Sequence, residues 1–446
     1  MSTGRRVVIT GLGVAAPIGL GVEPFWDALI ERRCGLGRVA AFDPSGLPAQ
    51  IAGELPPFNL ADYIPKQYRK SAKVMARDIL IAMVCAHDAA VDARLATPCI
   101  IARGEAPEPP NVDATRFGAN IGAGLICADL TELAGALATA TGEDGRFSLR
   151  RWGREGMENL TPLWLLKFLP NMLACHVTIV HDCQAPSNTI TCQEASSHLA
   201  VGEAFRTIAR GDADVCICGG AESKVNPMAM ARPLLLGRLN TESNASPQTA
   251  CRPFGRNRRG TVAAEGGGLV ILETLDHARR RGARIYAEVV GFGAASNASH
   301  WARPDPKGRA IALAVKNALR DAGVGSDNVQ LVTPLGVGTI EHDAAEMSGW
   351  REVFESNVEP VRALATRGAV GNCGAGSGAI DIVATTMALH RNTVPPSLNT
   401  DQLDPACPFR FVQGDPVDVP ITHAVTAAQA LAGGQVGALV LRRFEE

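Results

Sequence analysis

The sequence predicts an α/β fold with a mostly parallel sheet, because short apolar strands alternate with amphipathic helices through both halves of its 446 residues. In the first half, strand Val7–Thr10 is followed by a long helical pattern from Val74 to about Asp92. In the second half, strand Leu269–Leu275, helix Ala310–Ala322 and strand Val329–Thr333 continue the alternation. The halves share a buried strand that feeds a glycine turn, although they do not align residue by residue.

The composition narrows the classes of function. With 46% apolar and 20% charged residues, the chain has ample material for a packed core. Its net charge of −2 gives no reason to expect a nucleic acid as partner. The 12 cysteines are scattered, several of them inside apolar runs, which is typical of a reduced protein without a metal site.

Targeting and cofactor signals are weak. Met1 to Arg6 is polar and leads into the first strand, so we expect no signal peptide. No apolar run approaches the ~18 residues that a membrane span needs. We therefore expect a cytoplasmic protein. Gly11-Leu12-Gly13 lacks the third glycine of a dinucleotide fingerprint, since Ala16 stands at that place, and we expect no cofactor.

One stretch organises the chain. The β-branched strand Thr189–Thr191 runs into a helix marked by Val201, Phe205 and Ile208 on one face, with no Gly or Pro between. Enzymes often present a nucleophile at such a strand-to-helix turn, because the side chain stands at the positive end of the helix. Here the residue at the turn is Glu194, an unusual choice for that position.

With these elements placed, the chain resembles the β-ketoacyl-ACP synthases, and the synthase II type most of all. The stretches that carry the resemblance are Val7–Gly19, Ala185–Ser197, Gly211–Glu222, Arg252–Glu273, Arg284–His300 and Gly371–Asp381. The resemblance implies a thiolase fold, in which duplicated βαβαβαββ halves form five layers in the order α-β-α-β-α, and an obligate dimer. We place the two halves at residues 1–260 and 261–446.

The resemblance also implies a chemistry that this sequence does not support. The family needs a cysteine thiolate, two histidines and a lysine. These positions fall on Glu194, Leu335, Asn372 and Arg367. A carboxylate forms no useful thioester, leucine cannot exchange a proton, and asparagine cannot titrate. The family's gate loop also departs, reading Ala430-Leu431-Ala432-Gly433-Gly434. The sequence therefore predicts a site that no longer condenses acyl groups.

Two alternatives remain for Glu194. It could form an internal ion pair with Arg367 that plugs the former site. It could instead act as a general base or nucleophile with His300 or His342, which would make the chain an active acyltransferase or decarboxylase. His342 lies seven residues after Leu335, a separation that argues against substitution for the lost histidine. His300 matches a family histidine close to the site.

A non-catalytic copy has a known use in this family. The chain resembles the chain-length factor, which pairs with an active ketosynthase and shapes the acyl tunnel along the dimer interface. Usual chain-length factors carry glutamine where this chain has Glu194. The segments Phe117–Gly135 and Leu160–Met172 are the predicted interface and tunnel walls. A homodimer that binds an acyl chain or acyl carrier protein without chemistry is a further alternative.

A basic cluster supplies a candidate docking surface. Lys66, Arg69 and Lys70 fall where synthases of this type present positive charge to the acidic acyl carrier protein. A solvated helix start would have the same composition. The placement within the resemblance favours acyl carrier protein as a partner.

Overall fold

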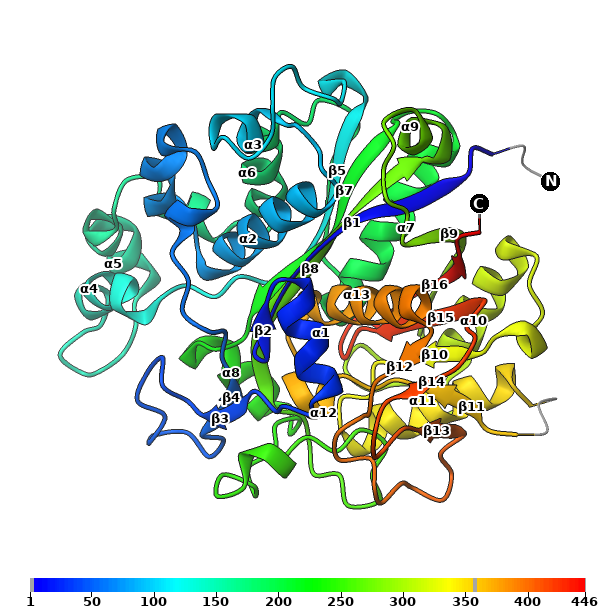
Figure 1. The fold of residues 1–446 in the computed structure, drawn as a ribbon. Helices are drawn as coiled ribbons and strands as arrows, with labels where there is room; N and C mark the ends of the chain where they lie inside the picture. The colour runs from blue at the N-terminus through cyan, green and yellow to red at the C-terminus, as the bar shows by residue number, and fades with distance from the viewer. Residues whose placement is uncertain (1–3, 356–358, 446) are drawn as a thin grey trace.

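A single mixed sheet runs through the whole molecule (Figure 1). The computed structural model describes residues 4–355 and 359–445, so the first three residues of the predicted polar N-terminus lie outside it. The main path of the 14-stranded sheet is β13-β11-β10-β15-β16-β9-β1-β8-β7-β5-β6, with β2, β3 and β4 paired beside it, and β1 and β9 join its two parts.

The two parts of the sheet repeat the same topology. The first repeat contains β1 (Val7–Ala16), β5 (Phe117–Ala123), β6 (Asn188–Ile190), β7 (Val215–Ser223) and β8 (Ala263–Thr274). The second contains β9 (Ala287–Ser296), β10 (Leu331–Thr333), β11 (Val361–Ala363), β15 (His423–Gln429) and β16 (Gln435–Arg443), with β13 (Phe409–Phe411) added at the edge. The orders β6-β5-β7-β8-β1 and β11-β10-β15-β16-β9 match strand for strand.

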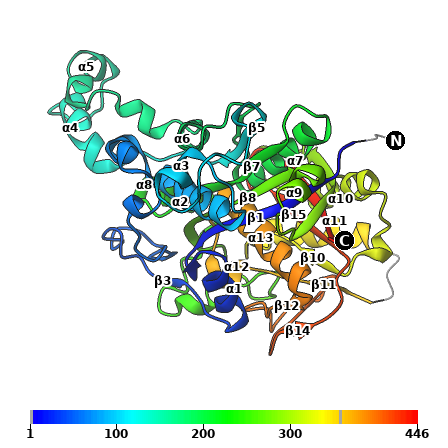
Figure 2. The same ribbon diagram turned by 45° about the horizontal axis from the view of Figure 1, so that its top comes forward.

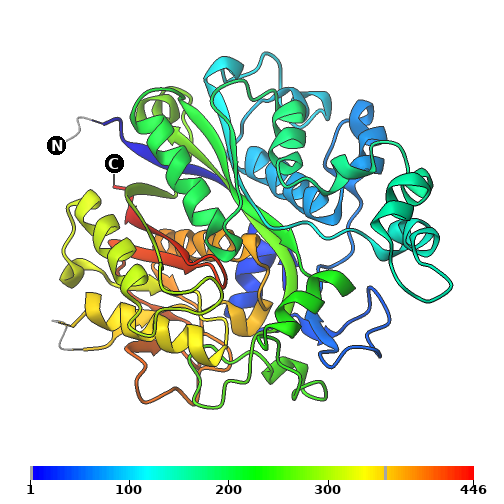
Figure 3. The same ribbon diagram turned by 180° about the vertical axis from the view of Figure 1, so that it is seen from behind.

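Helices lie in the same places in both repeats. The major helices are α2 (Arg77–Asp92), α6 (Met172–His181), α7 (Ser196–Ala209), α10 (Arg309–Ala322), α11 (Ile340–Val353) and α13 (Ala375–Arg391). Each repeat therefore reads βαβαβαββ. One apolar cluster packs α2 and α6 against the first part of the sheet, and another packs α10 and α11 against the second. Between them, α7 and α13 share the central core, as the view from behind shows (Figure 3). The predicted five-layer duplicated fold is confirmed.

The sheet differs from the expectation of mostly parallel strands. In the first repeat, β6, β5 and β7 are parallel, but β8 runs antiparallel to both of its neighbours, β7 and β1. In the second repeat, β11, β10 and β15 are parallel, and β16 runs antiparallel to β15 and β9. The sheet is therefore mixed. β8 begins just after residue 260, where the boundary between the halves was placed, and it pairs with β7 and β1 of the first repeat. That boundary stays a prediction.

Shorter elements surround this core. They are β2 (Gly19–Leu20), α1 (Val22–Ile30), β3 (Leu36–Arg38), β4 (Ile51–Gly53), α3 (Pro98–Ala102), α4 (Leu130–Ala140), α5 (Leu149–Arg154), α8 (Pro227–Leu235), α9 (Leu275–Arg280), α12 (Arg367–Val370), β12 (Thr393–Val394) and β14 (Val417–Asp418). Figure 2 shows α4 and α5 standing away from the body of the molecule. Within the described ranges, no helix combines the length and apolarity needed to cross a bilayer.

The boundary of α2 also differs from the sequence prediction. The helix begins at Arg77, and the preceding residues Lys66–Val74 form a 3₁₀ segment without any buried residue. Only Tyr68 and Ala72 of that segment pack against the core, and both are partly buried, so the segment does not continue the amphipathic pattern that buries α2.

Candidate functional site

The strand-to-helix turn after β6 contains a strained residue. The sequence predicted that the strand runs straight into the helix, but a 3₁₀ turn, Gln193–Ala195, lies between β6 and α7. Gln193 has a φ of 50°, a left-handed conformation that is uncommon for a residue with a Cβ. The serine hydroxyl of Ser196 accepts a hydrogen bond from the amide of Cys192 at 2.8 Å and braces the turn. This geometry places the Glu194 side chain in the interior.

Three donors hold the Glu194 carboxylate. Oε1 accepts a hydrogen bond from Asn372 Nδ2 at 3.0 Å and lies 3.6 Å from Lys224 Nζ. Oε2 accepts a hydrogen bond from the backbone amide of Leu431 at 3.1 Å. The structure therefore brings Glu194 and Asn372 together, as their family positions implied. The ion pair predicted between Glu194 and Arg367 is wrong, because Lys224 supplies the positive charge.

Lys224 lies between two carboxylates. Its Nζ is 3.8 Å from Glu222 Oε1, and its side chain keeps 17% of its surface exposed. Burial opposes ionisation of Glu194, but the charge of Lys224 and the hydrogen bonds from Leu431 and Asn372 outweigh it and hold the pKa of Glu194 below its ordinary value. Burial raises the pKa of Glu222. Lys224 interacts with both carboxylates, and the hydrogen bonds from Leu431 and Asn372 further stabilise the ionised form of Glu194.

Arg367 lies in the interior with a partner of its own. Arg367 Nη2 pairs with Asp381 Oδ1 and donates to the carbonyl oxygen of Ser377 at 2.9 Å. Asp381 also accepts a hydrogen bond from the Thr366 hydroxyl at 2.6 Å. Both side chains are fully buried. Because Arg367 lies on α12 and Asp381 on α13, the pair fixes these two helices to each other and does not face Glu194.

Leu335 lies in a small apolar cluster. It packs with Val337, Ala428 and Leu431. Its backbone amide donates to Glu346 Oε1 at 2.8 Å. The side chain has no group that could transfer a proton, so the position supplies packing only.

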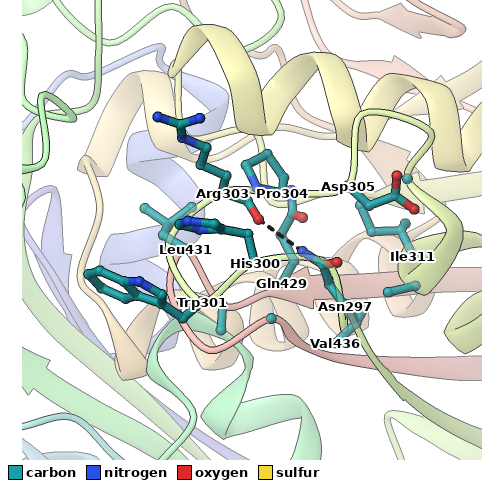
Figure 4. Close-up of a pocket in the computed structure, with 14 residues that line it drawn as sticks. Asn297, His300, Trp301, Arg303, Pro304, Asp305, Ile311, Gln429, Leu431 and Val436 are labelled. Carbon is teal, nitrogen blue, oxygen red and sulfur yellow. Dashed lines mark hydrogen bonds between the residues drawn. The ribbon is translucent and has the colours of Figure 1, made fainter.

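The two candidate histidines lie apart from the carboxylate. His342 is buried, with Nε2 3.0 Å from the carbonyl oxygen of Leu431, the residue whose backbone amide donates to Glu194. His300 is exposed, accepts a hydrogen bond from the amide of Ala302 at 3.0 Å, and stacks on Trp301. Figure 4 shows His300 in a small pocket beside Arg303 and Asn297. It does not line the cavity at Glu194.

Two backbone amides of the loop between β15 and β16 donate hydrogen bonds to side chains of the turn. The amide of Ala432 donates to Gln193 Oε1 at 3.0 Å, next to the Leu431 amide that donates to Glu194. Side chains of the turn thus take up both loop amides, which are then unavailable to an oxyanion.

A cavity of about 490 Å³ remains in front of Glu194, so the site is not plugged. Its walls are mostly apolar, with several cations among them: Leu125, Gln193, Glu222, Lys224, Ala229, Arg232, Pro233, Leu235, Leu236, Arg238, Leu239, Thr261, Ala263, Trp301, Asn372, Leu431 and Ala432. A glycine keeps the polar end open, since a Cβ at Gly374 would collide with Glu222 and Lys224. In the described ranges, no group of three His, Cys, Asp or Glu side chains could hold a metal ion.

The candidate docking residues lie on the surface. Lys66, Arg69 and Lys70 are exposed in the 3₁₀ segment before α2. Arg69 donates to the carbonyl oxygen of Ala61 at 3.0 Å. None of the three lies within 4.0 Å of a carboxylate in the part of the chain that the structure describes.

Comparisons with known proteins decide the family. Residues 4–278 match the family model of the β-ketoacyl synthase N-terminal domain, and residues 286–401 match that of its C-terminal domain. The chain belongs to the β-ketoacyl synthase family. The 3-oxoacyl-[acyl-carrier-protein] synthase 2 of Staphylococcus aureus (strain N315) is 30% identical over 445 residues, 100% of each chain. The thiolase-like fold and the family resemblance are thereby confirmed.

Two solved structures of this family are also similar. The ishigamide ketosynthase/chain length factor is 26% identical with a TM-score of 0.83, covering 99% of this chain and 100% of its own. A type II PKS acyl-carrier protein in complex with its ketosynthase is 25% identical with a TM-score of 0.82 and the same coverage.

Sequence reasoning missed two members of the ketosynthase-like site. Lys224 follows the apolar strand β7 directly, and a lysine two residues after Glu222 was the signal that could have been used. Leu431 acts through its backbone amide, so no side-chain pattern could reveal it.

Proposed function

We propose that this chain is a non-catalytic, ketosynthase-like subunit of the chain-length-factor type. It works in the cytoplasm beside an active ketosynthase and shapes the cavity that receives the growing acyl chain. The observation that carries the proposal is the state of Glu194. Its carboxylate replaces the nucleophile of the family and is held by Asn372, Lys224 and Leu431.

The chemistry around Glu194 supports the proposal. Condensation needs groups that accept an acyl chain, exchange protons and stabilise an oxyanion. Leu335 and Asn372 cannot exchange protons, and the amides of Leu431 and Ala432 are already hydrogen bonded to side chains of the turn. Each function is absent for a separate reason, so no single replacement restores the reaction.

The preserved cavity supports a role in shaping an acyl tunnel. Leu125 lines the cavity and is exposed, as are Leu163 and Leu165 on the predicted interface segment. Exposed apolar side chains favour contact with a second subunit. The similarity to a protein named ketosynthase/chain length factor agrees with this partner.

The exposed cations support contact with a carrier. Lys66, Arg69 and Lys70 have their charges available to an acidic partner. One of the similar structures is a complex of an acyl-carrier protein with its ketosynthase. We therefore include acyl carrier protein among the partners.

The rival function, an active acyltransferase or decarboxylase based on Glu194, has less support. Glu194 would have to leave three donors before attacking a substrate, and its lowered pKa makes it a weak base. His300 lines a different pocket, and the hydrogen-bond partner of His342 Nε2 is the carbonyl oxygen of Leu431. The homodimeric binding protein differs from our proposal only in the identity of the second subunit.

An activity assay separates these functions. We expect the purified protein to form no β-ketoacyl product from acyl- and malonyl-carrier protein, and no acetyl-carrier protein by decarboxylation. Glu194→Cys should remain inactive, because Leu335 and Asn372 still supply no acid or base. A ketosynthase that retains its cysteine and histidines is the positive control. Turnover that disappears in Glu194→Ala would establish the rival enzyme.

The partner is tested by affinity capture of the tagged protein from its native host, followed by mass spectrometry. We expect a stoichiometric second ketosynthase that has the cysteine and both histidines. Return of the protein alone as a homodimer would refute the chain-length-factor proposal.

A further inference from the structure

Two arginines lie side by side at the edge of the sheet in the second repeat. The parallel strands β11 and β13 end the main path of the sheet, on the opposite side of the molecule from α4 and α5 (Figure 1). Their register places Arg362 of β11 beside Arg410 of β13. By contrast, Arg442 of β16 stands beside Glu288 of β9, a charge of opposite sign, and pairs with it at 2.6 Å.

The guanidinium groups of Arg362 and Arg410 lie on the same face of the sheet. The residues before and after them in the two strands are buried in the apolar core that also contains α10 and α11: Val361, Ala363, Phe409 and Phe411. Because successive side chains of a strand alternate between faces, the two arginines occupy the outer face. Neighbouring strands are about 4.8 Å apart, so two like charges at this register destabilise the pairing.

The protein supplies no counter-ion for this pair. Within the described residues, no carboxylate lies within 4.0 Å of either guanidinium group. Arg362 is partly buried and Arg410 is exposed. Burial and the neighbouring charge of Arg410 both lower the pKa of Arg362. The N–H groups of both side chains are therefore available to an anion from outside the chain.

Both arginines line a hollow of about 370 Å³, a volume typical of small-molecule sites. The rest of its wall comes from the chain between β13 and β14: Phe411, Val412, Gln413, Gly414, Asp415 and Val417. The backbone amides of Gln413, Gly414 and Asp415 donate to no backbone carbonyl of the described residues, which adds unpaired donors to those of the arginines. The hollow shares no lining residue with the cavity at Glu194.

The loop that forms this wall is held in place. The side-chain amide of Gln413 donates to the carbonyl oxygen of Thr400 at 2.9 Å, and the backbone amide of Ser397 donates to that of Val412 at 2.7 Å. These contacts position the loop before any ligand binds, which lowers the entropic cost of binding. Asp415 adds one negative charge to the wall, so the two arginines leave the hollow with a positive balance.

A doubly charged anion fits this arrangement. A guanidinium group binds phosphate through two parallel hydrogen bonds, and two such groups on adjacent strands can share the terminal oxygens of one phosphate. A phosphate monoester has a second pKa of about 6, so it is a dianion above neutral pH. A carboxylate or a phosphate diester has a single charge and would leave one arginine without a counter-ion.

We propose that the hollow is a binding site for a phosphate monoester, with its dianionic phosphate between Arg362 and Arg410. The organic group of the ester lies against Val412 and Val417. This site lies beyond the proposed subunit role, because its residues are separate from the Glu194 cavity and its ligand is neither an acyl chain nor a carrier protein.

The test compares a monoester with its matched diester. The purified full-length protein is titrated at pH 8 with ethyl phosphate and with diethyl phosphate, at constant ionic strength and in a buffer free of phosphate and sulfate. Calorimetry and ³¹P NMR line broadening report binding. We expect the monoester to bind at least about tenfold more tightly, because only its second charge engages the second guanidinium group.

Variants assign the preference to the arginine pair. Arg362→Met and Arg410→Met should each weaken binding of ethyl phosphate at least about tenfold. Asp415→Asn should strengthen it, because the substitution removes the negative charge from the wall. Arg320→Met is the control and should behave as wild type, since Arg320 is an exposed arginine of α10 that hydrogen bonds to Asn317. Circular dichroism checks that each variant folds.

A vesicle assay identifies the source of the phosphate. The protein is sedimented with phosphatidylcholine vesicles that contain phosphatidic acid, a lipid with a phosphate monoester head group. Sedimentation that is lost in Arg410→Met would assign the site to a membrane lipid. Binding of ethyl phosphate without sedimentation would assign it to a soluble ester.

Two results would overturn the proposal. One is equal affinity of the wild-type protein for ethyl phosphate and diethyl phosphate. The other is a preference for the monoester that survives in the folded double variant Arg362→Met with Arg410→Met. Neither result bears on whether the protein pairs with an active ketosynthase, which the affinity capture tests separately.

Discussion

The two repeats place buried charges at equivalent strand-to-helix connections, but the charges differ in their partners and in their exposure to a cavity. In the first repeat, between β6 and α7, Glu194 pairs with a partly exposed Lys224 at the end of an open cavity. In the second, between β11 and α13, Arg367 pairs with Asp381 and both side chains are fully buried. The first repeat keeps space for a ligand, whereas the second uses its charges to join α12 to α13. One topology thus supports a binding site in one copy and a structural pair in the other.

The largest effect should come from the second repeat. We expect Arg367→Met to lower the free energy of unfolding by about 3–5 kcal/mol, because it leaves the Asp381 carboxylate buried without its charge partner. Urea unfolding measures the change. The double variant Arg367→Met with Asp381→Leu should recover most of the loss. A cost below about 1 kcal/mol for the single variant would show that water reaches the Arg367–Asp381 pair. The two repeats would then not differ in how they shield their charges from water.

The first repeat should tolerate loss of its cation better. We expect Lys224→Met to cost about 1–2 kcal/mol, because Glu194 keeps its hydrogen bonds from Asn372 and Leu431 and can take up a proton. Lys316→Met, which removes an exposed partner of Glu352, is the control and should cost less than about 0.5 kcal/mol. A loss as large as that of Arg367→Met would mean that the two sites are equally closed to water.

The smallest effect is the pH dependence that Glu194 contributes. Its pKa in the folded protein lies below the unfolded value of about 4.3, so its stabilising contribution is present above that pH and is lost as the pH falls through the folded pKa. We expect the difference in unfolding free energy between wild type and Glu194→Gln, about 1 kcal/mol near neutrality, to shrink as the pH falls below 4.

Glu346, a buried carboxyl group of the second repeat, should make stability change with pH in the opposite direction. Burial raises the pKa of Glu346 to about 8, so the folded protein retains a proton that the unfolded chain releases. Relative to Glu346→Gln, wild type should therefore lose stability as the pH rises from about 4.3 toward 8. Difference curves for the two variants that slope the same way would contradict the assignment of Glu194 as the ionised carboxylate.

Local patterns in the sequence predicted much of the fold. The strands β1 and β7 lie where apolar runs placed them, because both are buried along their whole length. The helices α7 and α10 lie where apolar periodicity placed them, because each buries one face against the sheet. The mixed direction of the sheet was not predictable from periodicity. Strand direction depends on how connections cross the sheet, and the connection from Lys224 to Val262 between β7 and β8 gives no local signal of that.

The candidate site was only partly predictable. Alignment with the family placed Glu194 and Asn372 at one site, and they are hydrogen bonded in the structure. It could not show that Arg367 faces Asp381, because the direction of a side chain on a short helix depends on the packing around it. Lys224 and the Leu431 amide were missed because they come from other elements of the fold.

The contacts of Glu194 have a consequence for the order of folding. Asn372 is 178 residues away along the chain and Leu431 is 237 residues away, and both belong to the second repeat. Contacts of such separation form only after the intervening chain has lost its loop entropy. The polar end of the cavity therefore cannot exist in a nascent first repeat alone. Synthesis must run almost to the C-terminus before the ligand site is complete, and any ligand that stabilises it acts on the docking of the two repeats.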